Sequence, residues 1–348
     1  MELSNVEKQT RSDMATQRHI QGQVCCIAGM HRSGTSMVAN LLHECGVFLG
    51  PEDELKLSSR HNIGGHFENS QFVSLNDDIL RKLGGTWHNP PRSDAGWEFN
   101  GKASGLVFRA RDLVTKFQRQ YWGWKDPRSS LTLPFWLRVF PDLKVLVCVR
   151  NPAEVAQSLF LRGDSRNAPP FQLWTTYCRQ LLSATRPEQR LITHYESYFE
   201  DPAGELRRIL DWLGIPASDE TVNHACTQVA VERRHHQIPL KELLAAGVPD
   251  AALGIYFSLC AEAGPVYERV RQMGATKRAE PSEALAAEVS RLRDELSHLR
   301  AFNNEILDSR SFKLVSLWWR MRRPRSDQEF GKKRRRGQLR TPMSVSGA

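Results

Sequence analysis

The chain has 348 residues, of which 40% are hydrophobic, and it carries a formal net charge of +9. This composition suffices for one large α/β domain with appendages or for two small domains. No apolar run is long enough for a membrane-spanning helix, and residues 1–22 lack the apolar stretch of a secretory signal. The seven cysteines are odd in number and form no C-x-x-C pair, which indicates reduced thiols in a cytoplasmic protein.

The positive charge is concentrated near the C-terminus. Residues 310–340 contain twelve Lys and Arg residues against Asp327 and Glu329, a net of +10, so the remaining residues together carry about −1. A nearly neutral globular part predicts no general or specific binding of nucleic acid.

Residues 23–41, QVCCIAGMHRSGTSMVANL, contain the strongest local pattern of the chain. The apolar run 24–28 predicts a buried strand, a loop follows from Gly29 to Gly34, and an amphipathic helix begins near Ser36. Such a loop directs backbone N–H groups and a helix N-terminus at one point, which predicts an anion site. The two glycines match the phosphate loop GxxxxGK[ST], but Thr35 replaces its lysine, and the cation is Arg32 inside the loop.

Glu68 precedes a segment with helical apolar spacing, which predicts a helix over about 69–83. The residues before it, 47–65, are expected to form a loop over the site. Glu68 has two interpretations of equal weight. It is either a carboxylate that favours the helix N-terminus or the general base for an acceptor hydroxyl, with His66 and His61 as the alternative bases.

Lys125 ends a short aromatic strand, 121–125, which follows a predicted helix over 106–119 and precedes another over 131–140. Open α/β sheets bind ligands at the carboxyl edge of their strands, so Lys125 is a candidate site residue. The alternative is a solvated charge at a strand end.

Residues 145–149 form a β-branched, fully apolar run, typical of a buried parallel strand. Arg150 ends this strand, Pro152 lies near the first position of the next helix, and Ser158 follows Arg150 by eight residues. The two side chains can converge on one face of a nucleotide.

The loop GMHRSGTS (29–36), the FEN element (67–69), WKDPR (124–128) and the Arg150–Ser158 pair occur in the order typical of one enzyme family. Residues 23–270 resemble the sulfotransferases that use 3′-phosphoadenosine 5′-phosphosulfate (PAPS), most closely bacterial carbohydrate-type members. The KDP portion is also similar to that of tyrosylprotein sulfotransferases. The resemblance implies an α/β fold, a P-loop-type three-layer domain with a central parallel sheet.

The same resemblance implies roles for individual residues. Arg150 and Ser158 would hold the 3′-phosphate, Arg32 and Lys125 would stabilise the transferring group, and Glu68 would act as the base. The loop residues that would bind the 5′-phosphosulfate are His31, Arg32, Ser33, Gly34, Thr35 and Ser36.

The function expected from these features is transfer of a sulfuryl group from PAPS to a hydroxyl of a carbohydrate or glycolipid, leaving 3′-phosphoadenosine 5′-phosphate (PAP), with no metal. One alternative is a P-loop kinase or nucleotide hydrolase, which the missing loop lysine disfavours. The other is a non-catalytic, membrane-associated scaffold.

The rest of the sequence predicts a further part of the domain core and segments that follow the domain. Residues 190–216 read as a strand, a turn and a helix of the core, and RRHH at 233–236 is either a further anion contact or a solvated turn. Heptad spacing over 285–306 predicts self-association or docking. Basic and aromatic residues over 311–323 predict contact with the inner surface of a membrane. The expected organisation is a disordered tail (1–22), a sulfotransferase domain (23–275), a coiled-coil or docking helix (281–308), and a basic amphipathic segment with a disordered tail (309–348).

Overall fold

A computed structural model describes residues 22–55, 65–92, 96–99, 101–117, 119–162, 169–230 and 246–276, together with residues 238 and 243. The predictions made for residues 1–21, for His61, for 233–236 and for 281–348 lie outside these residues.

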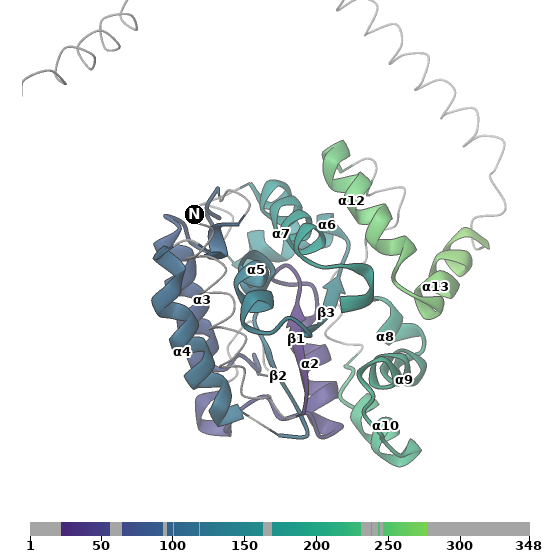
Figure 1. Cartoon of the computed structure of the whole chain (residues 1–348). Coiled ribbons are helices and arrows are strands. Elements are labelled where there is room, and N and C mark those ends of the chain that lie inside the picture. The colour runs from purple at the N-terminus through teal and green to yellow at the C-terminus, as the bar shows by residue number, and fades with distance from the viewer. Residues whose placement is uncertain are drawn as a thin grey trace, which may run out of the picture. The chain divides into compact units, whose positions relative to one another are not determined.

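The centre of the fold is a parallel sheet of four strands (Figure 1). Its members are β1 (Gln23–Ala28), β2 (Tyr121–Lys125), β3 (Lys144–Val149) and β4 (Arg190–His194), in the order β2-β1-β3-β4. The chain leaves β1 towards β2 on one side and leaves β3 towards β4 on the other. Such a reversal opens a crevice at the carboxyl ends of the two central strands, where open sheets bind ligands.

Both faces of the sheet are buried. Successive side chains of a strand point to opposite faces, so each strand contributes to two cores. In β1, Cys26 and Ala28 join one apolar core, whereas Cys25 and Ile27 join the other. The first core is covered by α3 (Ser70–Lys82), α4 (Gly101–Phe117), α5 (Ser129–Val139), α6 (Pro152–Arg162), α7 (Pro170–Ala184) and α12 (Asp250–Ala261). The second is covered by α2 (Thr35–Glu44), α9 (Pro202–Leu213) and α10 (Asp219–Cys226). The predicted three-layer α/β fold is therefore confirmed.

The remaining elements of the described part of the chain are three 3-10 turns and two helices. They are the 3-10 turns η1 (Glu52–Glu54), η2 (Trp97–Phe99) and η4 (Pro187–Gln189), the short helix α8 (Ser197–Glu200), and α13 (Pro265–Thr276).

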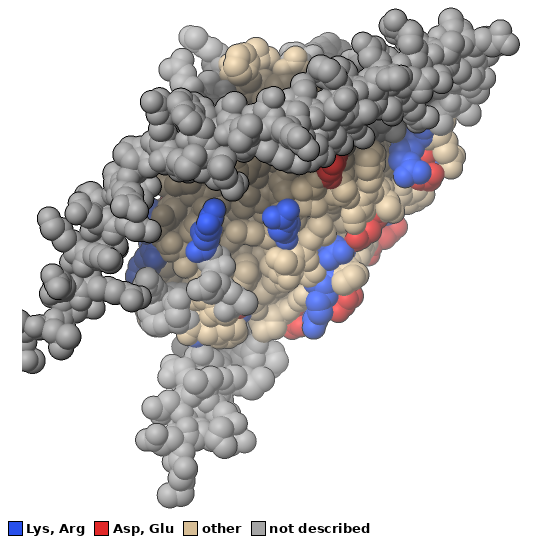
Figure 2. All heavy atoms as spheres, turned by 90° about the horizontal axis from the view of Figure 1, so that it is seen from above, with Lys and Arg blue, Asp and Glu red and all other residues tan. Residues whose placement is uncertain are grey.

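The described residues show a mixed surface charge, unpaired cysteines and no membrane-spanning helix. Seen from above, basic and acidic side chains alternate along one flank of the described surface (Figure 2), and the described part of this face has no broad patch of one sign. All seven cysteines are unpaired, and six of them are buried. Among the described helices, none combines the length and the apolar character needed to cross a bilayer.

Gly29 fixes the approach of the loop after β1 to the neighbouring strand. Its φ is 137°, and a Cβ there would lie 2.4 Å from the carbonyl oxygen of Cys148 in β3. We expect Gly29→Ala to destabilise the fold by about 2–5 kcal/mol, since a positive-φ penalty adds to a backbone clash. Gly46→Ala is the matched control, because φ is 87° there and the space is open. It should cost only about 1–2 kcal/mol in urea unfolding, and equal losses in both variants would contradict the clash.

Candidate active site

The loop between β1 and α2 lies at the crevice of the sheet and is conformationally strained. Gly34, the N-cap residue of α2, has φ 87° and makes no side-chain cap hydrogen bond, and Arg32 also has a positive φ of 71°. A non-glycine residue in this region costs about 1–3 kcal/mol, and such strain is concentrated at functional sites. The amide of Gly29 donates to Ser130 Oγ at 2.9 Å, which joins the loop to α5.

Arg32, Arg150 and Ser158 come together although they are distant in sequence. Arg32 Nε donates to Ser158 Oγ at 2.8 Å, and Arg150 Nη1 donates to the carbonyl oxygen of Arg32 at 3.4 Å. Because these contacts join the loop to the end of β3 and to α6, one extended anionic ligand can reach all three side chains.

Two partners of Arg150 were not anticipated from the sequence. Glu154 Oε2 accepts from Arg150 Nε at 2.8 Å, and the guanidinium lies 4.3 Å from the centre of the Tyr195 ring. Glu154 could have been found from its i+4 spacing, and Tyr195 from its position directly after β4. The Tyr195 ring also packs against Gly34, where a Cβ would lie only 2.5 Å from it.

Lys125 and Glu68 form a buried ion pair, with 2.8 Å between Lys125 Nζ and Glu68 Oε1. Lys125 is 2% exposed and Glu68 5%, so the interpretation of Lys125 as a solvated charge is wrong. Glu68 does not cap α3 either, because the Asn69 side chain accepts from the amide of Gln71. Phe67, directly before Glu68, has a positive φ of 52°.

The Glu68 carboxyl group is ionised at neutral pH. Burial raises its pKa, but the charge and hydrogen bond of Lys125, with smaller contributions from His31 and Arg128, outweigh burial and lower the pKa to about 2. The pair therefore presents an ammonium group and a carboxylate together at the end of β2.

Next to the Lys125–Glu68 pair lies a polar network that the sequence did not reveal. The guanidinium of Arg128 lies 3.0 Å from Asp126, 2.9 Å from Asp77 and 3.9 Å from Glu68. Asn76 of α3, fully buried, donates to Asp126 Oδ2 at 2.8 Å and accepts from Thr132 and Trp136 of α5. Asn76, Asp126 and Thr132 are buried and paired, and Asp77 closes the network at its more exposed side, so the network fixes the position of the β2 carboxyl end relative to α3.

The other loop residues predicted to bind the 5′-phosphosulfate do not all face the Arg32–Ser158 contact. The His31 ring lies 4.6 Å from the Trp87 ring and 5.9 Å from the Tyr177 ring, so it points away from the Arg32–Ser158 contact. Ser33 Oγ is buried and has no hydrogen-bond partner among the described residues. Thr35 is buried at the start of α2, and Ser36 Oγ donates to the carbonyl oxygen of His66 at 3.3 Å, which joins the loop to the segment that carries Glu68.

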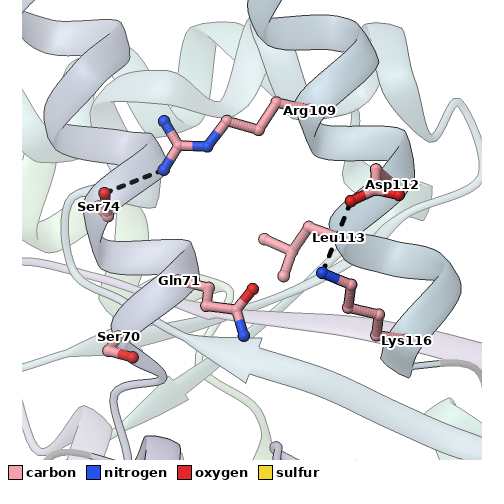
Figure 3. A pocket seen from close by; sticks show the side chains of 7 residues that line it. All are labelled: Ser70, Gln71, Ser74, Arg109, Asp112, Leu113 and Lys116. Atoms are coloured by element: carbon pink, nitrogen blue, oxygen red, sulfur yellow. Dashed lines mark hydrogen bonds and ion pairs between the residues drawn. The ribbon is translucent and has the colours of Figure 1, made fainter.

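A surface pocket between α3 and α4 is separate from this site. It measures about 390 Å³ and contains none of the predicted site residues (Figure 3). Its charges are paired within or beside the lining, since Arg109 contacts Ser74 and Asp78, and Lys116 lies 3.6 Å from Asp112. The described residues contain no group of three or more His, Cys, Asp or Glu side chains suited to a metal ion.

Comparison with known proteins identifies the family. A family model described as "Sulfotransferase family" matches residues 25–219, more than half of the chain. Over 109 residues the chain is 28% identical to a candidate protein-tyrosine sulfotransferase of Caenorhabditis elegans. That match covers 29% of this chain and 42% of the relative, so the chain spans less than half of the relative's length.

Two solved structures are more distant. The sulfotransferase domain of the Synechococcus PCC 7002 olefin synthase is 19% identical, covering 69% of this chain and 96% of that domain, with a TM-score of 0.43. A sulfotransferase domain from the curacin biosynthetic pathway is 16% identical, covering 69% of this chain and 97% of that domain, with a TM-score of 0.41. The assignment rests on the family model: the chain belongs to the sulfotransferase family.

Proposed function

We propose that this protein transfers a sulfuryl group from PAPS to the hydroxyl group of an acceptor. The observation that carries the proposal is the arrangement along the carboxyl edge of the sheet. Arg32, Arg150 and Ser158 meet on the β3 side of the glycine loop, and the Lys125–Glu68 pair lies at the end of β2 on the other side.

The chemistry of these groups suits a donor with two anionic ends. The loop offers backbone amides, a helix N-terminus and the Arg32 guanidinium to the 5′-phosphosulfate. Arg150 and Ser158 offer a guanidinium and a hydroxyl to the 3′-phosphate. The buried hydroxyl of Ser33 has no partner among the described residues, as is expected of a group that contacts a ligand.

PAPS supplies a sulfur–oxygen bond that is ready to break, and the protein stabilises the charge that develops. Arg32 and Lys125 are held in place before the reaction, by Ser158 and by Glu68, so they need little reorganisation to act on the bridging oxygen. Glu68 is the base implied by the family resemblance.

We propose a carbohydrate or glycolipid hydroxyl as the acceptor, as the bacterial character of the motifs indicates. A second candidate is a tyrosine hydroxyl of a protein, which the name of the C. elegans relative favours. The Trp87 indole, which lies beside His31, is compatible with both acceptors, since a sugar ring and a phenol each pack on an indole face.

Incubation with ³⁵S-labelled PAPS and three acceptors tests the proposal: N-acetyllactosamine, galactosylceramide and an acidic tyrosine peptide. We expect label in the first or second, and label in the peptide alone would select the tyrosine candidate. Tight PAP binding without transfer to any acceptor would favour the scaffold alternative. Magnesium-dependent ATP turnover would favour the kinase or hydrolase.

Arg150→Ala is expected to weaken PAP binding about 10- to 150-fold, because it removes a charge-assisted contact of about 1.5–3 kcal/mol. Isothermal titration of PAP measures this. Arg190→Ala is the matched control. Arg190 also forms an ion pair, with Glu262 at 2.9 Å, but it is the first residue of β4 and so lies at the amino ends of the strands, away from the site. Equal PAP affinity in the wild type and Arg150→Ala would remove Arg150 from the donor site.

A further inference from the structure

His31 and Arg32 are adjacent in sequence but face opposite halves of the site. Arg32 extends to Ser158 of α6, whereas the His31 ring packs against Trp87 and Tyr177. The Tyr177 hydroxyl of α7 donates to the carbonyl oxygen of Trp87 at 2.9 Å, so both aromatic neighbours of His31 are held in place. His31 therefore belongs to the β2 half of the site, with Lys125 and Glu68, and not to the half that contains the two arginines.

The His31 imidazole carries an unused polar atom. His31 is 8% exposed, and its Nε2 is buried without a hydrogen-bond partner among the described residues. Leaving such an atom unpaired costs about 1–3 kcal/mol, so a buried unpaired nitrogen in a functional site indicates a ligand contact.

The ring is neutral at physiological pH. Burial lowers the His31 pKa well below its usual range, and the positive charges of Arg128, Lys125 and Arg162 lower it further, against the opposing effect of Glu68. Every molecule therefore has an imidazole nitrogen lone pair ready to accept a proton.

Glu68 is poorly placed for the same task. Lys125 Nζ lies 2.8 Å from one carboxylate oxygen, and Arg128 Nη1 lies 3.9 Å from the other. Two cations that stabilise a carboxylate also weaken it as a proton acceptor. A hydroxyl approaching Glu68 would have to displace an ion pair, whereas His31 Nε2 has no partner among the described residues and accepts a proton when the ring proton is on Nδ1.

We propose that His31, rather than Glu68, receives the proton of the acceptor hydroxyl; the inference rests on the proposed sulfuryl transfer. The acceptor oxygen forms a bond to sulfur, and the bond between sulfur and the bridging phosphate oxygen breaks. The electron pair of that bond stays on the phosphate of PAP, and the hydroxyl proton moves to His31 Nε2. The hydroxyl becomes strongly acidic as its oxygen bonds to sulfur, so a weakly basic imidazole suffices late in the step. Glu68 then acts as a positioning residue that holds Lys125 and faces the new imidazolium with a negative charge.

The test compares His31→Ala and His31→Phe with the wild type, using whichever of the three labelled acceptors the wild type sulfates. We expect turnover at saturating PAPS to fall about 10²-fold, the lower end for general base catalysis, with PAP affinity within about threefold of wild type. His31→Phe keeps a ring against Trp87 and Tyr177, so a similar loss there excludes a packing defect. Added imidazole should restore part of the turnover of His31→Ala and none of that of Lys125→Met.

His88→Ala is the matched control, because His88 also packs on Trp87, with ring centres 5.2 Å apart, and should leave turnover unchanged. The inference is overturned if both His31 variants transfer label at the wild-type rate, if imidazole rescues neither rate nor yield, or if PAP affinity falls in proportion to turnover. The last result would return His31 to the donor site. A wild type that labels none of the acceptors contradicts the proposed function instead, so the two failures are distinct.

Discussion

Replacing Lys125 by methionine is expected to lower turnover about 10²–10³-fold, the cost of removing one preorganised donor, and to destabilise the fold by about 3–5 kcal/mol. The second effect arises because Lys125 and Glu68 are both almost fully buried, so the variant leaves a carboxylate without its nearest cation. Turnover at saturating PAPS and urea unfolding measure the two effects separately.

The double variant Lys125→Met/Glu68→Gln distinguishes catalysis from stability. Replacing a buried ion pair by uncharged groups of similar volume is often neutral or stabilising. We therefore expect the double variant to unfold near the wild-type urea midpoint while its turnover stays as low as that of Lys125→Met. Recovery of turnover together with stability would show that Lys125 serves the fold and not the chemistry.

Arg32→Ala is expected to lose about 10²–10³ in turnover, on the order of 3–4 kcal/mol of transition-state stabilisation. The guanidinium approaches Ser158 from inside the glycine loop, so its loss leaves the transferring group without its nearest cation on the β3 side. Single-turnover transfer of ³⁵S label at saturating PAPS measures the effect.

The backbone of Arg32 provides the control. Its φ of 71° is strained for alanine and relaxed for glycine, so Arg32→Gly should be more stable than Arg32→Ala by about 1 kcal/mol. Both variants lack the guanidinium and should be equally slow. A fast Arg32→Gly variant would attribute the loss in Arg32→Ala to the shape of the loop.

The sequence was most informative where local chemistry alone determines the structure. The apolar run before Arg150 forms β3, and Pro152 is the first residue of α6. The helix predicted over 69–83 is observed as Ser70–Lys82. In each case the decisive residues lie within one helix or strand, so no tertiary information was needed.

Helices α12 and α7 were not predicted, and the predicted start of α4 is too late. In α12, DAALGIYFSLCA, apolar residues occur on all sides, so no face stands out. The helix predicted to begin at residue 106 begins at Gly101, because small and polar residues form its first turn. The segment of α7 does have helical spacing at Leu173, Trp174, Tyr177, Cys178 and Leu181, and this signal could have been used.

The site residues that escaped prediction depend on tertiary contacts. Asn76 and Asp126 are 50 positions apart and meet only because α3 packs on α5. The orientation of His31 follows from the positions of Trp87 and Tyr177, on two different segments. Residue type and spacing identify which groups carry charge, but the side to which each one turns depends on packing.

The carboxylate beside Arg150 sets how strictly the nucleotide is recognised. Glu154 already satisfies one edge of the guanidinium and also accepts the amide of Ile238 at 3.0 Å. A nucleotide without a 3′-phosphate would therefore leave no buried charge unpaired, and steep rejection of an analogue requires such an unpaired group. For the proposed donor we therefore expect graded, not steep, discrimination between PAPS and nucleotides that lack the 3′-phosphate.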